Sequence, residues 1–416
     1  MLEGQWQLAA SRIANQWENP NDVLTILLII GGDIVQKAIA QLAAGKFVPV
    51  AFSFGWVSYS FNALLAVFGE GALMPPVVCP STLINARSGY GRLNYSWVLN
   101  RLLHGVEHSI GPLDAALCVS VFRSKQHSAH ASRDWIWWSG VVTILVQLCV
   151  AIVPCALHSD WTILLVTIAG AGLALSGGSL QQWRLEKWGA RLDDKNTTFC
   201  LTRGNGFQHV LVIQNQASGS LNLEDLAMPR RYGCLASCKA AVTVLAMLWI
   251  VFLINVAGLR NNTWYLLGVG FVGMAQNMFV AAVPRQPDAM GLPLDLVTRI
   301  QGPKVMRVLV DTERQFPLVG LALVKTFFPG GLNAIEEAYW ATREREGRSF
   351  SGSGVPSAQP PENLDPPPIL QQIKNDSQWT PNSPHTATMT TEPVSAETIR
   401  ALPSLAAFAL ARRNTQ

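Results

Sequence analysis

Charge is scarce in this chain. Only 14% of its 416 residues are Asp, Glu, Lys or Arg, whereas soluble domains carry roughly 25%. The net charge of +4 is small and no long block of Lys and Arg occurs, so a nucleic-acid-binding surface is not predicted. Hydrophobic residues make up 49% of the chain. This composition favours a membrane protein over a soluble protein of the same length.

Closely paired cysteines and a cleavable leader are also missing. The seven cysteines are scattered without a C-x-x-C pair, which excludes a disulfide framework or a zinc ribbon and favours reduced thiols. The first twenty residues lack the basic start, short apolar core and cleavage site of a secretory signal. Their apolar residues recur at helical steps, which predicts an amphipathic helix on the membrane surface over 1–20. A helix packed on a soluble lobe is the alternative.

Long apolar runs are abundant. A helix needs roughly 20 mostly apolar residues to cross a bilayer, and six segments meet this length. They pair into three hairpins through short links at 44–46, 158–160 and 259–263. Aromatic residues cluster at several segment ends, as expected at a membrane interface. The six predicted spans are 23–43, 47–68, 136–157, 161–180, 240–258 and 264–283.

The distribution of Lys and Arg predicts the orientation. The three short links contain only Lys46 and Arg260, whereas the two long loops contain six and eight basic residues. Because positive charge stays in the cytosol, we expect both long loops and both termini to be cytosolic. The pattern does not separate the plasma membrane from endomembranes.

The predicted fold is an all-α membrane protein, a six-span bundle with a small cytosolic β-hairpin insert and a disordered C-terminal tail. The hairpin is expected at 197–213, where a Gly-rich turn separates two apolar runs. The tail is rich in Ser, Thr and Pro. The predicted parts are a surface helix (1–20), spans one and two (21–69), a cytosolic loop (70–135), spans three and four (136–180), a cytosolic insert with the hairpin (181–239), spans five and six (240–283), membrane-proximal helices (284–346) and the tail (347–416).

Six phrases of the sequence carry a resemblance to a known group of proteins: GGDIVQKAIAQL at 31–42, FVPVAFSFGWVSYSFNALL at 47–65, SGYGRLNYSW at 88–97, LTRGNGFQHVLVI at 201–213, LNLEDLA at 221–227 and ERQFPLVGLALVKTFFPGGLNAIEEAYW at 313–340. They resemble multi-pass membrane proteins of filamentous ascomycete fungi, a group without an assigned function. The resemblance covers most of residues 20–345. It implies a membrane protein and no particular activity, substrate or cofactor.

Asp33 and Lys37 form the most notable polar pair, because both fall inside the first predicted span. One helical turn separates them, so they can form an ion pair on one face. A charge at bilayer depth costs roughly 2.5–3.5 kcal/mol on insertion scales. Asp33 could therefore serve a proton or cation step, or Lys37 could neutralise it in a pair that joins helices. The other polar candidates inside spans are Gln36, Asn62, Gln147, Asn255, Gln276 and Asn277.

Two motifs point to chemistry that their surroundings do not favour. His104 and His108 lie in an H-x-x-E-H sequence, which is typical of inverted zinc proteases and could bring two imidazoles to one metal. The loop is too short for a protease domain, and a membrane-proximal polar helix is the simpler interpretation. Gly268, Gly270 and Gly273 form a G-x-G-x-x-G sequence in the sixth predicted span, where the strand–turn–helix context of a dinucleotide site is lacking.

These features favour a non-enzymatic membrane component that acts through its cytosolic loops and tail on protein partners. No catalytic residue, cofactor or nucleic-acid partner is predicted, and the lipid bilayer is the expected surrounding. The alternatives are a transporter or channel that uses Asp33, and a metal-dependent membrane enzyme that uses His104 and His108. A polar cavity touching Asp33 would support the transporter.

Overall fold

The computed structural model describes residues 31–43, 45–111, 114–125, 133–193, 196–216, 219–228, 236–259 and 261–352. All of them belong to the first of two compact units, Met1–Asp365. The predicted surface helix at 1–20 lies outside the described residues, as does the predicted tail beyond residue 352.

Four helical segments are long and apolar enough to cross a bilayer, which indicates a membrane protein. They are Trp135–His158, Thr162–Lys187, Ala236–Ala257 and Thr263–Ala282. The first, third and fourth are α6, α10 and α11, while the second consists of α7 (Thr162–Gly178) and the short α8 (Gln181–Lys187). Only 22–33% of their most apolar stretches is buried by the protein. The exposed side chains are largely Val, Leu, Ile, Met and Phe, as expected for surfaces that face lipid.

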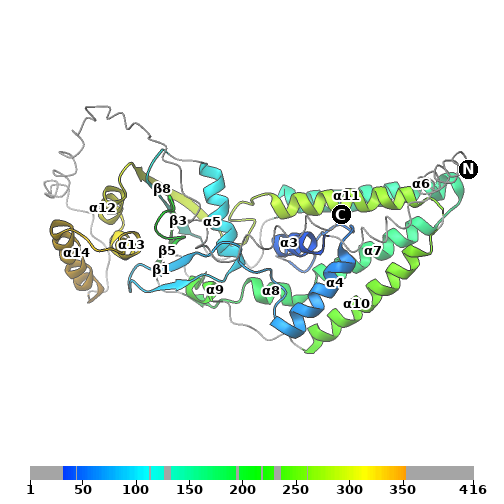
Figure 1. Cartoon of the computed structure of the whole chain (residues 1–416), viewed down its shortest axis with the longest axis horizontal. Coiled ribbons are helices and arrows are strands. Elements are labelled where there is room, and N and C mark those ends of the chain that lie inside the picture. Colours follow the sequence, from blue (N-terminus) through cyan, green and yellow to red (C-terminus); the bar gives the residue numbers. More distant parts are fainter. Residues whose placement is uncertain are drawn as a thin grey trace, which may run out of the picture. The chain divides into compact units, whose positions relative to one another are not determined.

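The prediction of six spans is wrong, because the first two predicted spans are not both continuous membrane helices. The second, 47–68, is non-helical up to Gly55 and then forms α4 (Trp56–Leu65), which continues as a π-helical turn, η1 (Ala66–Glu70). Pro49 and Gly55, whose φ is 95°, explain the break, because both disfavour a continuous helix. Of the first predicted span, α3 (Gly32–Leu42) is the described helical part. Both short helices pack against each other and against the long helices (Figure 1).

The all-α prediction is also wrong, because the described residues include a mixed six-stranded sheet. Its strand order is β2-β1-β5-β6-β3-β8; β3 and β6 pair in parallel, and all other neighbours pair antiparallel. A two-stranded ribbon pairs β4 (Leu192–Asp193) with β7 (Ser220–Leu221). The strands of the large sheet are β1 (Thr82–Asn85), β2 (Gly91–Leu93), β3 (Leu117–Ser124), β5 (Thr197–Thr202), β6 (His209–Asn215) and β8 (Leu294–Gly302).

The sheet is assembled from three stretches of chain that the apolar helices separate. β1, β2 and β3 precede α6, β5 and β6 lie between α8 and α10, and β8 follows α11. The predicted hairpin corresponds to β5 and β6, which occupy the middle of the sheet rather than a separate insert. We call the sheet and the helices packed on it the sheet domain.

Helices cover both faces of the central strands. On one face, Phe199, Leu201 and Leu211 belong to the same buried cluster as Leu99 and Leu103. Leu99 and Leu103 lie on α5 (Trp97–Ile110). The short helix α9 (Leu223–Ala227) packs on the same face beside β1. The other face is covered by α12 (Val305–Gln315) and α13 (Val319–Phe327), with α14 (Ala334–Gly352) packed on α13. Burial on both faces explains why these strands are continuously apolar rather than alternating.

A buried carboxylate holds the turn between α12 and α13. Glu313 is 5% exposed and accepts hydrogen bonds from the backbone N–H groups of Leu318 (2.7 Å) and Leu321 (3.0 Å). These donors lie at the start of α13, where N–H groups lack helical partners. Burial raises the pKa of Glu313, and the backbone donors oppose that rise. The side chain therefore positions α13 on the sheet.

We expect Glu313→Ala to lower the free energy of unfolding of the sheet domain by about 1–3 kcal/mol, because buried N–H groups lose their acceptor. Thermal unfolding of the full chain in detergent, followed by circular dichroism, measures the change. The matched control is Glu337→Ala on α14, where the carboxylate is exposed. An equal midpoint for the two variants would contradict the assigned role of Glu313.

Candidate functional site: an extended segment inside the helix bundle

The most unusual element of the bundle is the non-helical segment at 47–55. From Val50 to Phe54 each residue is at most 4% exposed. Backbone without regular structure is tolerated at membrane depth only where protein or a water-filled cavity surrounds it. Here it is surrounded by protein, because residues of α6, α7, α10 and α11 contact it. Phe47 is 46% exposed, whereas residues 48–55 are all buried; we call residues 48–55 the enclosed segment.

Glycines in the long helices make room for the enclosed segment. A Cβ added to Gly273 on α11 would lie 1.8 Å from the carbonyl oxygen of Phe52, and one added to Gly140 on α6 would lie 2.2 Å from that of Pro49. Gly170 on α7 faces the ring of Phe52 in the same way, at 2.8 Å. Gly270 and Gly273 of the G-x-G-x-x-G sequence thus serve close packing on an apolar helix.

Two buried amides satisfy the backbone of the enclosed segment. The Nε2 of Gln147 on α6 donates to the carbonyl oxygens of Phe52 (2.5 Å) and Val269 (2.8 Å). The Nδ2 of Asn277 on α11 donates to the carbonyl oxygen of Ala51 (3.1 Å) and to the Oγ of Ser53 (2.8 Å). A buried carbonyl without a donor costs roughly 1–3 kcal/mol. The two amides therefore offset part of the free-energy cost of burying non-helical backbone inside an apolar bundle.

Aromatic rings close the segment on its other side. Phe52 and Trp56 both stack on Trp249 of α10, with ring centroids 6.3 and 5.6 Å apart. Phe252 packs edge-on against Phe52 at 5.4 Å. A hollow beside Trp56 and Trp249 has a volume of about 20 Å³, which is room for one water molecule. The neighbourhood of the enclosed segment is therefore tightly packed.

Three cations hold helix ends where the bundle meets the sheet domain. Lys187 is 2% exposed, and its Nζ donates to the carbonyl oxygens of Ala40 (2.8 Å) and Gln41 (3.2 Å) at the end of α3. Arg285 donates to the same Gln41 oxygen at 2.7 Å. Arg101 on α5 donates to the carbonyl oxygen of Ala281 at the end of α11, at 3.1 Å. Cations are favourable at helix C-termini because the exposed carbonyls carry partial negative charge.

We call Arg101, Lys187 and Arg285 the cation junction. The charge of Arg285 is balanced by Asp134, whose carboxylate accepts two hydrogen bonds from Arg285 at 2.7 and 2.8 Å. The same carboxylate accepts the backbone N–H of Trp137 and so caps α6. The junction fastens α3, α5, α6, α8 and α11 together.

The structure places Asp33 and Lys37 on the surface of α3. Both side chains are exposed, and among the described ion pairs none joins them. Asp33 lies in the first turn of α3, where a negative charge is favourable. Gln147 and Asn277 are the predicted polar residues that meet at the enclosed segment. Gln36 donates to Leu73, Gln276 to Ser139 and Asn255 to Val251 of its own helix, while Asn62 is exposed.

His104 and His108 lie on α5, both exposed. The Nδ1 of His104 is 3.9 Å from the Oε2 of Glu107, which forms a shorter ion pair with Arg203 at 2.7 Å. Burial and the neighbouring Arg101 and Arg203 lower the pKa of His104. Among the described residues, no group of three His, Cys, Asp or Glu side chains is placed to hold a metal ion. His127 and His130 lie outside the described residues.

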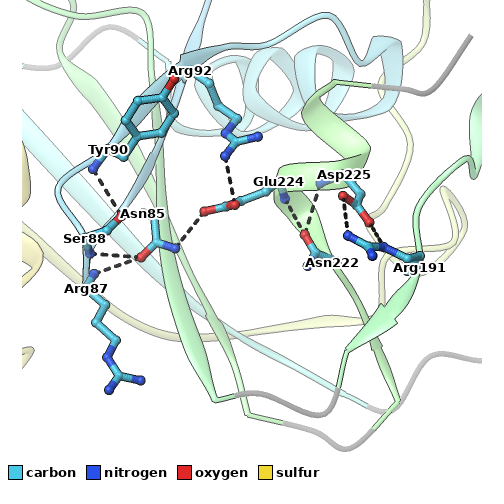
Figure 2. A network of polar contacts seen from close by, with 9 residues as sticks. All are labelled: Asn85, Arg87, Ser88, Tyr90, Arg92, Arg191, Asn222, Glu224 and Asp225. Atoms are coloured by element: carbon cyan, nitrogen blue, oxygen red, sulfur yellow. Dashed lines mark hydrogen bonds and ion pairs between the residues drawn. The ribbon is translucent and has the colours of Figure 1, made fainter. Parts of the chain in front are cut away.

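A polar network fixes α9 to the edge of the sheet (Figure 2). Glu224 on α9 pairs with Arg92 of β2 at 3.0 Å and accepts a hydrogen bond from Asn85 of β1 at 2.7 Å. Asp225 is held by two hydrogen bonds from Arg191. The phrases SGYGRLNYSW and LNLEDLA therefore meet in space, and their charged residues hold elements of the sheet domain together.

Sequence reasoning missed the enclosed segment and the cation junction. The available signals were Pro49 and Gly55 inside an apolar run, the glycines facing them, and Lys187 and Arg285 just after apolar helices. Basic residues in such positions also mark the cytosolic end of a span, so their hydrogen bonds to helix ends could not be read from sequence.

No protein-family model, curated protein or solved structure matches this chain.

We expect Gly273→Ala to lower the free energy of unfolding of the bundle by roughly 1–3 kcal/mol or more, the usual cost of overpacking a core. The reason is that a backbone carbonyl occupies the space of the new methyl group. Gly268→Ala on the same helix is the matched control, since nothing lies within 4 Å of its added Cβ. The thermal unfolding midpoint of the full chain in detergent measures both. If Gly268→Ala lowers the midpoint as much as Gly273→Ala, close packing on the enclosed segment is not the reason why Gly273→Ala is less stable.

Proposed function

We propose that this chain is an integral membrane protein that acts as a non-enzymatic platform, holding the sheet domain at the cytosolic surface for protein partners. The observation that carries the proposal is one sheet built from three stretches of chain with apolar helices between them. The strands of one sheet must lie on the same side of a membrane. α6 with α7, and α10 with α11, are therefore hairpins that each cross and return.

Charge supports the cytosolic side for the sheet domain. Arg133, Lys239 and Arg285, together with Arg184 and Lys187 of α8, lie at the helix ends next to the sheet domain. The links at the opposite ends contain Asp160 and Arg260 as their charged residues. Basic residues remain on the cytosolic side during insertion. The cytosolic placement of both termini stays a prediction.

The buried and partly buried ionisable groups support a structural platform. Glu313 positions α13, Lys187 and Arg285 bind carbonyl oxygens at the end of α3, and Glu107 pairs with Arg203. Each is used to fasten one element to another. The cation junction joins the bundle to the sheet domain through hydrogen bonds. A partner bound to the sheet domain is therefore held at the membrane.

An interrupted membrane segment is also typical of transporters, whose unwound backbone binds the solute. In this chain the carbonyl oxygens of Ala51 and Phe52 already accept hydrogen bonds from Asn277 and Gln147. A solute would have to displace both amides. The platform therefore accounts for the enclosed segment with fewer rearrangements than a transporter does.

The topology is tested with glycosylation acceptors, each placed on a spacer that carries it away from the membrane. We expect modification of an acceptor inserted between α10 and α11 and none of an acceptor inserted at 216–219, because only the first reaches the lumen of the endoplasmic reticulum. Endoglycosidase-sensitive gel shifts report the result. Modification at 216–219 would contradict the cytosolic placement of the sheet domain.

Vesicles containing the purified full chain separate a platform from a transporter. We expect proton, sodium and potassium fluxes, followed with encapsulated dyes, to equal those of protein-free vesicles. We also expect Gln147→Leu to lower the unfolding midpoint without a change in flux, because Phe52 loses its donor. A saturable flux that Gln147→Leu or Asp33→Asn abolishes, while Gly268→Ala retains it, would overturn the platform.

A further inference from the structure

A cluster of exposed cations and aromatic rings lies at the start of α6. The guanidinium of Arg133 sits 4.8 Å from the ring centroid of Trp137. Phe47 packs edge-on against the same ring at 6.0 Å, and Trp138 at 5.0 Å. Lys46, which precedes Phe47, is exposed. We call Lys46, Phe47, Arg133, Trp137 and Trp138 the α6 cluster.

The two cations of the α6 cluster lack a carboxylate partner among the described ion pairs. The nearest acid in sequence, Asp134, is engaged by Arg285 and by the backbone of Trp137. Lys46 and Arg133 come from separate parts of the chain, and Trp137 is contacted both by Arg133 and by Phe47, the residue after Lys46. Among the described residues, neither cation is neutralised by an ion pair of its own.

The position of the α6 cluster, at the start of a helix long enough to cross a bilayer, indicates the chemical class of its ligand. α6 is long and apolar enough to cross a bilayer, and Trp135, Trp137 and Trp138 open it. Tryptophan is enriched at the level of lipid headgroups. A guanidinium matches the geometry of a phosphate and tolerates an aromatic face beneath it. A second cation–ring contact, between Lys239 and Phe68 at 5.6 Å, lies at the start of α10, so the same chemistry recurs at another span.

We propose that the α6 cluster binds the headgroup of an anionic phospholipid. Arg133 and Lys46 contact the phosphate region while the rings of Phe47, Trp137 and Trp138 pack beside the upper acyl chains. The inference rests on the proposed membrane insertion of the chain and adds a lipid preference to it. The bound lipid supplies a negative partner for Arg133 and Lys46, which form no ion pair among the described residues.

The test uses the full chain in nanodiscs of phosphatidylcholine with a minor share of phosphatidylserine. After extraction into mild detergent, native mass spectrometry counts the retained lipids of each kind. We expect retained phosphatidylserine to exceed its bulk share, and each of Lys46→Gln and Arg133→Gln to reduce this enrichment about fivefold, because one cation near an anionic surface contributes that factor. Trp137→Leu should weaken it as well, since Arg133 loses the ring that orients it.

The matched control is Arg299→Gln with Lys304→Gln, which removes the same charge from exposed positions on the sheet domain. We expect this control to keep the enrichment. Equal loss in the control and in the Lys46→Gln/Arg133→Gln variant would overturn the site, because net charge alone would then explain the retention. Competition by millimolar inorganic phosphate would overturn the lipid as the ligand and indicate a free-phosphate site.

Flotation with vesicles separates this inference from the proposed function. A wild-type chain that floats with phosphatidylcholine vesicles but shows no enrichment of phosphatidylserine would overturn the lipid site alone. A wild-type chain that stays in the aqueous fraction without detergent would overturn the membrane platform, and the lipid site with it.

Discussion

The bundle depends on the hydrogen bonds that Gln147 and Asn277 donate to the enclosed segment. A helix satisfies its own backbone, whereas an extended segment leaves carbonyl and N–H groups that lipid cannot satisfy. The carbonyls of Ala51 and Phe52 are therefore placed against amides from two different long helices. This requirement also explains the glycines, because an amide reaches a backbone carbonyl only if the helix bearing it comes close. The buried amides of Gln147 and Asn277 and the glycines that face the enclosed segment are both consequences of this one interruption.

α3 also connects the bundle to the sheet domain. α3 ends at Leu42, and the residues of its last turn are buried by the protein. Lys187 and Arg285 bind these carbonyls, and Arg285 in turn holds the cap of α6. Arg101 ties α5 to the end of α11. Because α5 packs on the sheet, these hydrogen bonds link the ends of α3 and α11 to the sheet domain.

The four long helices and the β5–β6 pair were readable from sequence because their signals are local. Apolar runs such as 240–258 have about the length of a span, and glycines mark the turn at 203–206. The sheet was not readable, since β3 pairs with β6 and β8 across intervening apolar helices, and short strands give weak signals. The run at 47–68 has the composition of a span, and its break between Pro49 and Gly55 is accommodated by partners on α6, α7 and α11. Asp33 drew attention for its depth in a predicted span, yet α3 places it in an exposed first turn.

Long-range pairing also limits where the sheet domain can contact other molecules. Its β8 edge carries exposed Leu296 and Val297, but the register shifts opposite Val121 and Phe122, and Lys125 pairs with Asp295 at 2.7 Å. An irregular, charged edge resists pairing with a further strand. A partner recognised by side chains is therefore better matched to this domain than one that extends the sheet.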